Sequence, residues 1–105
     1  MKPTDAIISA LFSKAEYVMS WGTHNLILAD NEVRISVKAL KFTGIVEIRY
    51  ICIRDLYRIS LINEDGSINH IEEDLPIHMI VDKIDELIEF VENYEDAVKA
   101  RYNMK

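Results

Sequence analysis

Apolar residues recur every three or four positions near the start of the chain. Within residues 4–20 they are Ile7, Ile8, Leu11, Phe12, Ala15, Val18 and Met19. This spacing places them on one face of an α-helix. Thr4 suits the N-cap, and Gly22 suits a left-handed C-terminal end. The pattern therefore predicts one helix over residues 4–20, with Trp21 covering the end of the core.

The middle third of the chain alternates apolar and polar residues, which is the period of a β-strand. Turn-forming residues divide it at Asp30-Asn31, Thr43-Gly44, Arg54-Asp55 and 63–66. We expect about five strands, over residues 25–29, 32–42, 45–53, 56–62 and 67–72. A bulge near Ala39, or the end of the strand there, would explain a flip in the apolar register. Because the connections are short, neighbouring strands are expected to pair antiparallel in chain order.

A second helical pattern follows, opened by the segment 72–76 and running to about Lys99. Its apolar stripe consists of Ile77, Ile80, Val81, Ile84, Leu87, Ile88, Val91, Tyr94 and Val98. The opposite side carries Asp82, Asp85, Glu86, Glu89, Glu92, Asn93 and Asp96. This distribution predicts a long C-terminal helix with an apolar face against the sheet and an acidic face in water.

These elements predict a two-layer α+β fold. It consists of an N-terminal helix, an antiparallel meander of about five strands and a long C-terminal helix, with both helices on one face of the sheet. The 105 residues form a single domain, 1–105, because this length buries one core and no more. The chain is 50% hydrophobic with three glycines and two prolines, which is typical of a compact domain.

Charge is divided unequally along the chain. Residues 33–62 carry six basic and two acidic side chains, a net charge of +4. Residues 63–98 carry twelve acidic side chains and one basic, a net charge of −11. The pattern predicts basic charge on the sheet and acidic charge on the last helix, which could guide a partner or a second copy of the chain. The overall charge of −6 disfavours generic binding to nucleic acid or anionic membrane.

The face of the sheet turned away from the helices is the candidate interaction surface. It is expected to hold Arg34, Lys38, Ile45, Arg49, Ile51, Ile53, Leu56 and Arg58. Arginine mixed with large aliphatic residues favours a docking surface. A solvated sheet face with arginine stems lying over aliphatics remains the alternative. Reading of single-stranded RNA would require aromatic platforms, for which Phe42 is the one candidate.

Residues able to support chemistry are few. The chain has no glycine-rich phosphate loop, no Gly-x-Ser-x-Gly and no Cys-x-x-Cys. Cys52, the single cysteine, is expected on the apolar side of a strand, where a thiol is inert. His78 with Asp82, and His70 with Glu72, have spacings that could hold a metal ion, but zinc sites gather more Cys and His than this. We therefore predict no catalytic, cofactor or metal site.

The pattern as a whole predicts a non-catalytic protein-interaction module that self-associates as a homodimer. One alternative is an acidic decoy that inhibits a nucleic-acid-binding protein by occupying its basic groove. Another is a small metal-dependent enzyme or ligand binder that uses His78 and Asp82. The lone cysteine, and a short apolar run at 6–12 flanked by charge, predict a cytoplasmic protein without a membrane or small-molecule partner.

Overall fold

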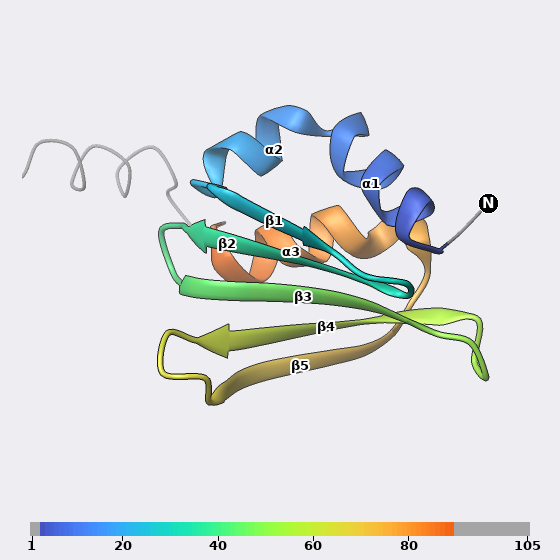
Figure 1. Cartoon of the computed structure of the whole chain (residues 1–105). Helices are drawn as coiled ribbons and strands as arrows, with labels where there is room; N and C mark the ends of the chain where they lie inside the picture. Colours follow the sequence, from blue (N-terminus) through green and yellow to red (C-terminus); the bar gives the residue numbers. More distant parts are fainter. Residues whose placement is uncertain (1–2, 90–105) are drawn as a thin grey trace, which may run out of the picture.

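The computed structural model describes residues 3–89 and shows one five-stranded sheet with helices packed on it (Figure 1). The strands are all antiparallel and follow chain order, β1-β2-β3-β4-β5. The elements are α1 Pro3–Ser13, α2 Ala15–Ser20, β1 Asn25–Leu28, β2 Glu32–Lys38, β3 Thr43–Ile51, β4 Leu56–Asn63, β5 Ile68–Leu75, the 3-10 helix η1 Ile77–Met79 and α3 Ile80–Ile88. The predicted order of helix, antiparallel meander and helix is confirmed.

The core lies between the helices and one face of β2, β3 and β4. Alternate residues of these strands are buried, as the period of two requires: Val33, Ile35, Val37, Val46, Ile48, Tyr57, Ile59 and Leu61. α1 adds Ile7 and Leu11 to the same cluster, and α3 adds Ile80, Val81, Ile84 and Ile88. The predicted inner sides of these three strands are confirmed.

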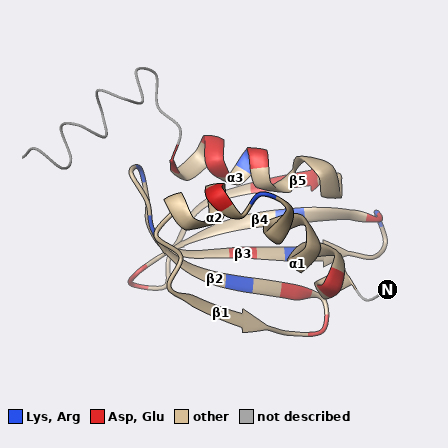
Figure 2. Cartoon of the chain, turned by 90° about the horizontal axis from the view of Figure 1, so that it is seen from above, with Lys and Arg blue, Asp and Glu red and all other residues tan. Residues whose placement is uncertain are grey.

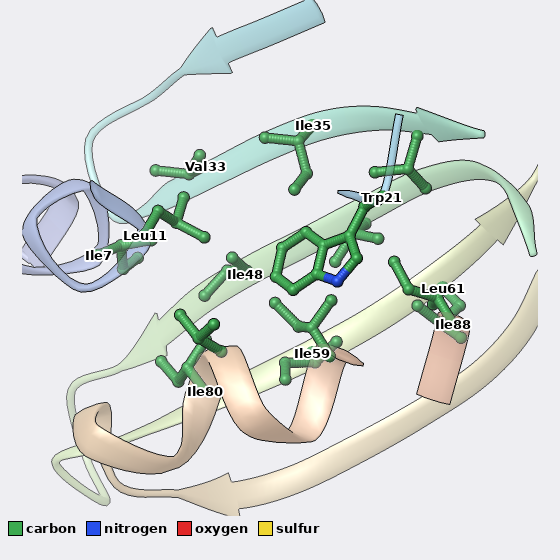
Figure 3. Close-up of a cluster of buried hydrophobic side chains, with 14 of the residues drawn as sticks. Ile7, Leu11, Trp21, Val33, Ile35, Ile48, Ile59, Leu61, Ile80 and Ile88 are labelled. Carbon is green, nitrogen blue, oxygen red and sulfur yellow. The ribbon is translucent and has the colours of Figure 1, made fainter. Parts of the chain in front are cut away.

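Trp21 is the centre of this core. Its side chain is completely buried and lies among Ile35, Ile48 and Ile59 (Figure 3). Its indole Nε1 donates a hydrogen bond to Asp85 Oδ1 at 3.0 Å, and its backbone carbonyl accepts one from Lys38 N–H at 2.9 Å. Trp21 therefore joins the end of α2 to both α3 and β2, and it fills the centre of the core rather than covering its end as predicted.

The N-terminal segment is not the single helix predicted for residues 4–20. The backbone of Lys14, at φ −130° and ψ 53°, leaves the helical region and separates α1 from α2. Because the two helices do not share one continuous stripe, Phe12 and Met19 remain 70% and 79% exposed. Thr4 is not the N-cap either, since it lies inside α1 and its buried hydroxyl donates to the carbonyl oxygens of residues 29 and 30.

The predicted turn at Thr43-Gly44 is wrong. β2 ends at Lys38, and the turn spans residues 39–42, closed by a 2.9 Å hydrogen bond from Ala39 N–H to Phe42 O. Gly44 lies inside β3, where the carbonyl oxygen of Ile62 and the ring of Phe42 crowd the place of a Cβ. This glycine is required by close backbone approach rather than by a turn.

The last strand and last helix are also displaced from their predicted bounds. β5 extends to Leu75, so the acidic residues 72–74 belong to a strand and do not open the helix. The pairing with β4 places Glu72 opposite Ile59 and Leu75 opposite Tyr57, with an irregularity between these two pairs. α3 begins at Ile80 and ends at Ile88, and its predicted continuation over 90–99 lies outside the described residues.

Cys52 is exposed and not buried as predicted. β3 ends at Ile51, two residues before the predicted end, so Cys52 and Ile53 lie in the turn to β4. The turn predicted at Arg54-Asp55 is confirmed, with Asp55 at a φ of 53°.

Replacing Trp21 by alanine is expected to destabilise the fold by about 3–5 kcal/mol, because it leaves a large cavity and an unpaired Asp85. Ile53→Ala is the matched control, since this side chain is 94% exposed and its removal is expected to cost less than about 0.5 kcal/mol. Urea unfolding followed by far-ultraviolet circular dichroism measures both free energies. Similar losses in the two variants would contradict a core centred on Trp21.

Candidate interaction surfaces

Seven of the eight predicted surface residues lie on β2, β3 or β4, facing away from the helices. In each strand they alternate with core residues, so they share the outer face: Arg34, Lys38, Ile45, Arg49, Ile51, Leu56 and Arg58. The eighth, Ile53, lies in the turn between β3 and β4. The sheet therefore brings the seven strand residues together, and their role in binding stays a prediction.

The centre of this outer face is an ion-pair quartet of two arginines and two glutamates on β2 and β3. The register places Arg34 opposite Glu47 and Arg49 opposite Glu32. Arg34 contacts both carboxylates, with Nε 2.7 Å from Glu32 Oε2 and Nη2 3.0 Å from Glu47 Oε2. Arg49 Nη2 lies 2.5 Å from Glu32 Oε1, and its Nε lies 3.6 Å from Glu47 Oε1. The quartet therefore has no net charge, and β2 and β3 each carry basic residues (blue) and acidic residues (red) (Figure 2).

Glu32 is the group whose ionisation the quartet controls. Partial burial alone would raise the pKa of Glu32, but hydrogen bonds from Arg34 and Arg49 outweigh it and hold that pKa below its usual value of 4.5. The carboxylate is thus kept ionised to lower pH than a free glutamate. The two arginines are held in turn, which restrains them from reaching toward an outside partner.

The remaining arginines of the sheet are also paired. Arg58 Nη1 lies 3.5 Å from Glu73 Oε1, and Arg54 contacts Asp74 at 2.6 Å and 2.8 Å. The two acidic partners lie near the end of β5, in the segment 72–76 that the pattern assigned to the start of the last helix. The separation of basic charge on the sheet from acidic charge on the helix is therefore wrong, because β5 brings its acids into the sheet.

The acidic side of α3 is only partly open to water. Asp82 contacts Lys14, Asp85 accepts from the Trp21 indole, and Glu86 lies 3.1 Å from Lys83 Nζ. Glu89 is 3% exposed, and its carboxylate accepts a hydrogen bond of 3.1 Å from Leu40 N–H in the β2–β3 turn. The carboxylates of Asp82, Asp85 and Glu89 tie α3 to neighbouring elements, whereas the Glu86–Lys83 pair lies within α3, so the prediction of a wholly solvated acidic face is wrong.

The histidines lie apart from one another and near different elements. Nε2 of His70 is 2.9 Å from Glu72 Oε1, as their predicted shared strand face allows, and Nδ1 of His24 is 3.0 Å from Gly22 O. His78 lies in η1 and not in the same α-helix as Asp82. Among residues 3–89 no three His, Cys, Asp or Glu side chains gather closely enough to hold a metal ion.

A second surface, which the sequence pattern did not reveal, is an apolar groove between the two N-terminal helices and the edge of the sheet. The groove encloses about 290 Å³ and has apolar surface throughout. Its lining residues are Ile8, Leu11, Phe12, Ala15, Val18, Met19, Thr23, Leu26 and Ile35. Thr23 adds no free hydroxyl, because its Oγ1 donates to Val18 O at 2.9 Å. The groove therefore offers burial and shape but no titratable group.

The groove continues onto β1, the edge strand beside it. Leu26, Ile27 and Leu28 are 45%, 54% and 56% exposed, although all three are large and apolar. Figure 2 shows β1 at the margin of the sheet and without charged residues. We call Phe12, Met19 and these three β1 residues the groove surface, which extends around the strand edge because Ile27 lies opposite Arg34 on the outer face. The apolar spacing placed Phe12 and Met19 on the stripe of a single predicted helix, and residues 25–29 were predicted only as a strand, so neither pattern indicated this surface.

Comparison with known proteins adds no functional assignment. No protein-family model, curated protein or solved structure matches the chain. Within residues 3–89, no helix has both the length and the apolar character that crossing a bilayer requires. Function therefore has to be inferred from the geometry of the two surfaces.

Glu32→Gln is expected to lower the free energy of unfolding by about 1 kcal/mol at neutral pH, because the quartet is partly exposed. In the folded protein the pKa of Glu32 lies below 4.5, the value expected for the unfolded chain. The stabilisation that Glu32 contributes is therefore complete above pH 4.5 and is lost as the pH falls through the lower pKa of the folded state. The difference between wild type and variant should therefore shrink in acid, as measured by urea unfolding at several pH values. Glu64→Gln, in an exposed turn, is the control, and an unchanging difference for Glu32→Gln would contradict the quartet's role.

Proposed function

We propose that this protein is a non-catalytic protein-interaction module that associates with a second copy of itself. The observation that carries the proposal is the groove surface, where large apolar side chains remain uncovered beside an uncharged sheet edge. Contiguous apolar surface of this kind is typical of interaction sites, because water-exposed apolar area costs free energy that association recovers.

The area of the groove surface is suited to association between proteins. The exposed fractions of its five side chains amount to about three whole side chains, or about 600 Å² at roughly 200 Å² each. Stable interfaces bury roughly 800 Å² on each partner. The area still needed for a stable interface is supplied by the neighbouring backbone of β1 and by the half-exposed rim of the groove.

The outer face of the sheet is the weaker candidate for this contact. Docking there would require the quartet and the Arg58–Glu73 pair to exchange ion pairs already made within the chain. Desolvating paired charges costs free energy that new contacts have to recover. The aliphatic residues between them, such as Ile45 and Leu56, are already half-buried. Association through the groove requires no such exchange.

Apolar lining also favours binding over catalysis at this surface. Acid–base and nucleophilic chemistry need a titratable or nucleophilic side chain within reach of the reacting atoms. The residues that line the groove include none. What they can supply is an apolar contact area of defined shape.

Sedimentation velocity at low micromolar concentration is expected to show a dimer at both low and high salt, because apolar burial is little affected by screening. Met19→Lys should raise the dissociation constant at least about a hundredfold, since each of the two copies loses a buried methionine that contributes about 1.5–3 kcal/mol. A wild-type monomer at both salt concentrations would remove the proposal.

Two variants make the test specific. Ile53→Lys adds the same charge at a position that is also largely exposed, in the turn at the far end of the sheet from α2, and should leave the dimer intact (Figure 1). Ile45→Lys places the charge on the outer face. Dissociation by Ile45→Lys but not by Met19→Lys would assign the dimer to the outer face and reject the groove surface.

A further inference from the structure

We propose that two copies join by antiparallel pairing of their β1 edges about a twofold axis at Ile27. The two five-stranded sheets then form one continuous sheet of ten strands. This inference rests on the proposed self-association and specifies its geometry. It is carried by the backbone of β1, by its side chains on both faces and by the contrast with the other edge strand.

The backbone of β1 has hydrogen-bonding groups turned toward the free edge. The bond from Ala29 N–H to Glu32 O, 3.0 Å long, fixes Ala29 as a residue that faces β2. Because an antiparallel ladder alternates, Ile27 also faces β2, while Leu26 and Leu28 turn their N–H and C=O groups outward. The side-chain oxygen of Asn25 accepts from Leu26 N–H at 3.0 Å, so this donor is engaged locally before a partner strand replaces it.

The side chains of β1 point to an occupant that contacts both faces of the strand at once. Leu26 and Leu28 lie opposite Ile35 and Val33 of β2, on the side of the core, whereas Ile27 lies opposite Arg34 on the outer face. All three are about half exposed. A ligand seated in the groove alone would cover Leu26, which lines it, and leave Ile27 in water. A second strand added at the edge covers all three.

The opposite edge of the sheet is better protected against such pairing than β1, although Ile68 and Ile71 of β5 are also about half exposed. β5 carries the three consecutive acids 72–74, and its pairing with β4 has two irregularities. Charge and irregular geometry are the usual means by which a sheet edge avoids another strand. β1 has neither, since it consists of one asparagine and three aliphatic residues in regular register.

Symmetry and side-chain chemistry select the register. With the axis at Ile27, Leu26 lies opposite the partner's Leu28, and the outward backbone groups of these residues form the hydrogen-bonded pairs. The same register places His24 opposite the partner's Asp30, a favourable cross-strand combination. Moving the axis to Leu28 would instead place Leu26 opposite the partner's Asp30. The register at Ile27 thus pairs apolar with apolar residues.

This arrangement also completes the groove. In each copy the helices leave the core-facing side of β1 half covered, with Phe12 and Met19 exposed beside it. Strand pairing brings the partner's Leu26 and the partner's Leu28 against that side. The two grooves then meet across the axis and bury each other's open rims.

Cysteine cross-linking tests the axis directly. In a Cys52→Ser background, Ile27→Cys places the new thiol opposite its own copy in a non-hydrogen-bonded pair, where Cα atoms are about 4.5 Å apart. This separation lies within the range of a disulfide. Mild oxidation is expected to convert most of the chain into a covalent dimer, visible on a non-reducing gel and by mass spectrometry of the linked peptide.

Asn25→Cys in the same background is the matched control. It lies on the same strand and the same face, but the proposed register separates it from its own copy by about four residues, or roughly 13 Å. This distance is too long for a disulfide. Efficient cross-linking through Ile27→Cys and not through Asn25→Cys supports the axis.

Leu28→Pro provides a second readout, because it removes an outward N–H without removing a bond to β2. The dissociation constant of the Leu28→Pro dimer is expected to rise at least tenfold, with an unchanged circular dichroism spectrum.

A wild-type dimer in which Ile27→Cys fails to cross-link would overturn edge pairing and leave self-association standing. A wild-type monomer would overturn both. If Leu28→Pro unfolds the chain, the cross-linking result alone decides.

Discussion

Burial of Trp21 is the constraint on which the rest of the structure depends. The side chain follows α2 and penetrates to the centre of the core, where Asp85 of α3 accepts its indole hydrogen and its carbonyl is bound by β2. α2 has to end where Trp21 can enter. A break at Lys14 separates α2 from α1, and the two helices do not bury a single stripe. The exposed side chains of Phe12 and Met19, and with them the groove, accompany this arrangement.

The two faces and two edges of the sheet differ in their packing, charge and regularity. The inner face is covered by helices, and the outer face is neutralised by its own ion pairs. The β5 edge is acidic and irregular, which disfavours pairing. The β1 edge and its adjoining groove combine exposed apolar side chains with a regular, uncharged strand, so a partner that covers them removes apolar surface from water.

The predicted interaction surface illustrates how tertiary pairing changes the meaning of a charge pattern. Arg49 and Arg34 were correctly assigned to the outer face, because alternation along a strand fixes which side a residue faces. Across the β2–β3 ladder, Glu47 neutralises Arg34 and Glu32 neutralises Arg49, and Glu73 of the neighbouring strand β5 pairs with Arg58. Counting charges along the chain could not show this, because the register brings together residues that the sequence separates.

By itself the sequence determined the order of the elements and the inner sides of β2, β3 and β4, since both follow from periodicities of two and near four. The exposure of Cys52, the close approach at Gly44 and the groove were decided by tertiary structure alone. A local pattern specifies which side chains avoid water, but not whether the fold has room for them. Trp21 and α3 occupy that room, so Phe12 and Met19 stay outside the core despite an apolar spacing that predicts burial.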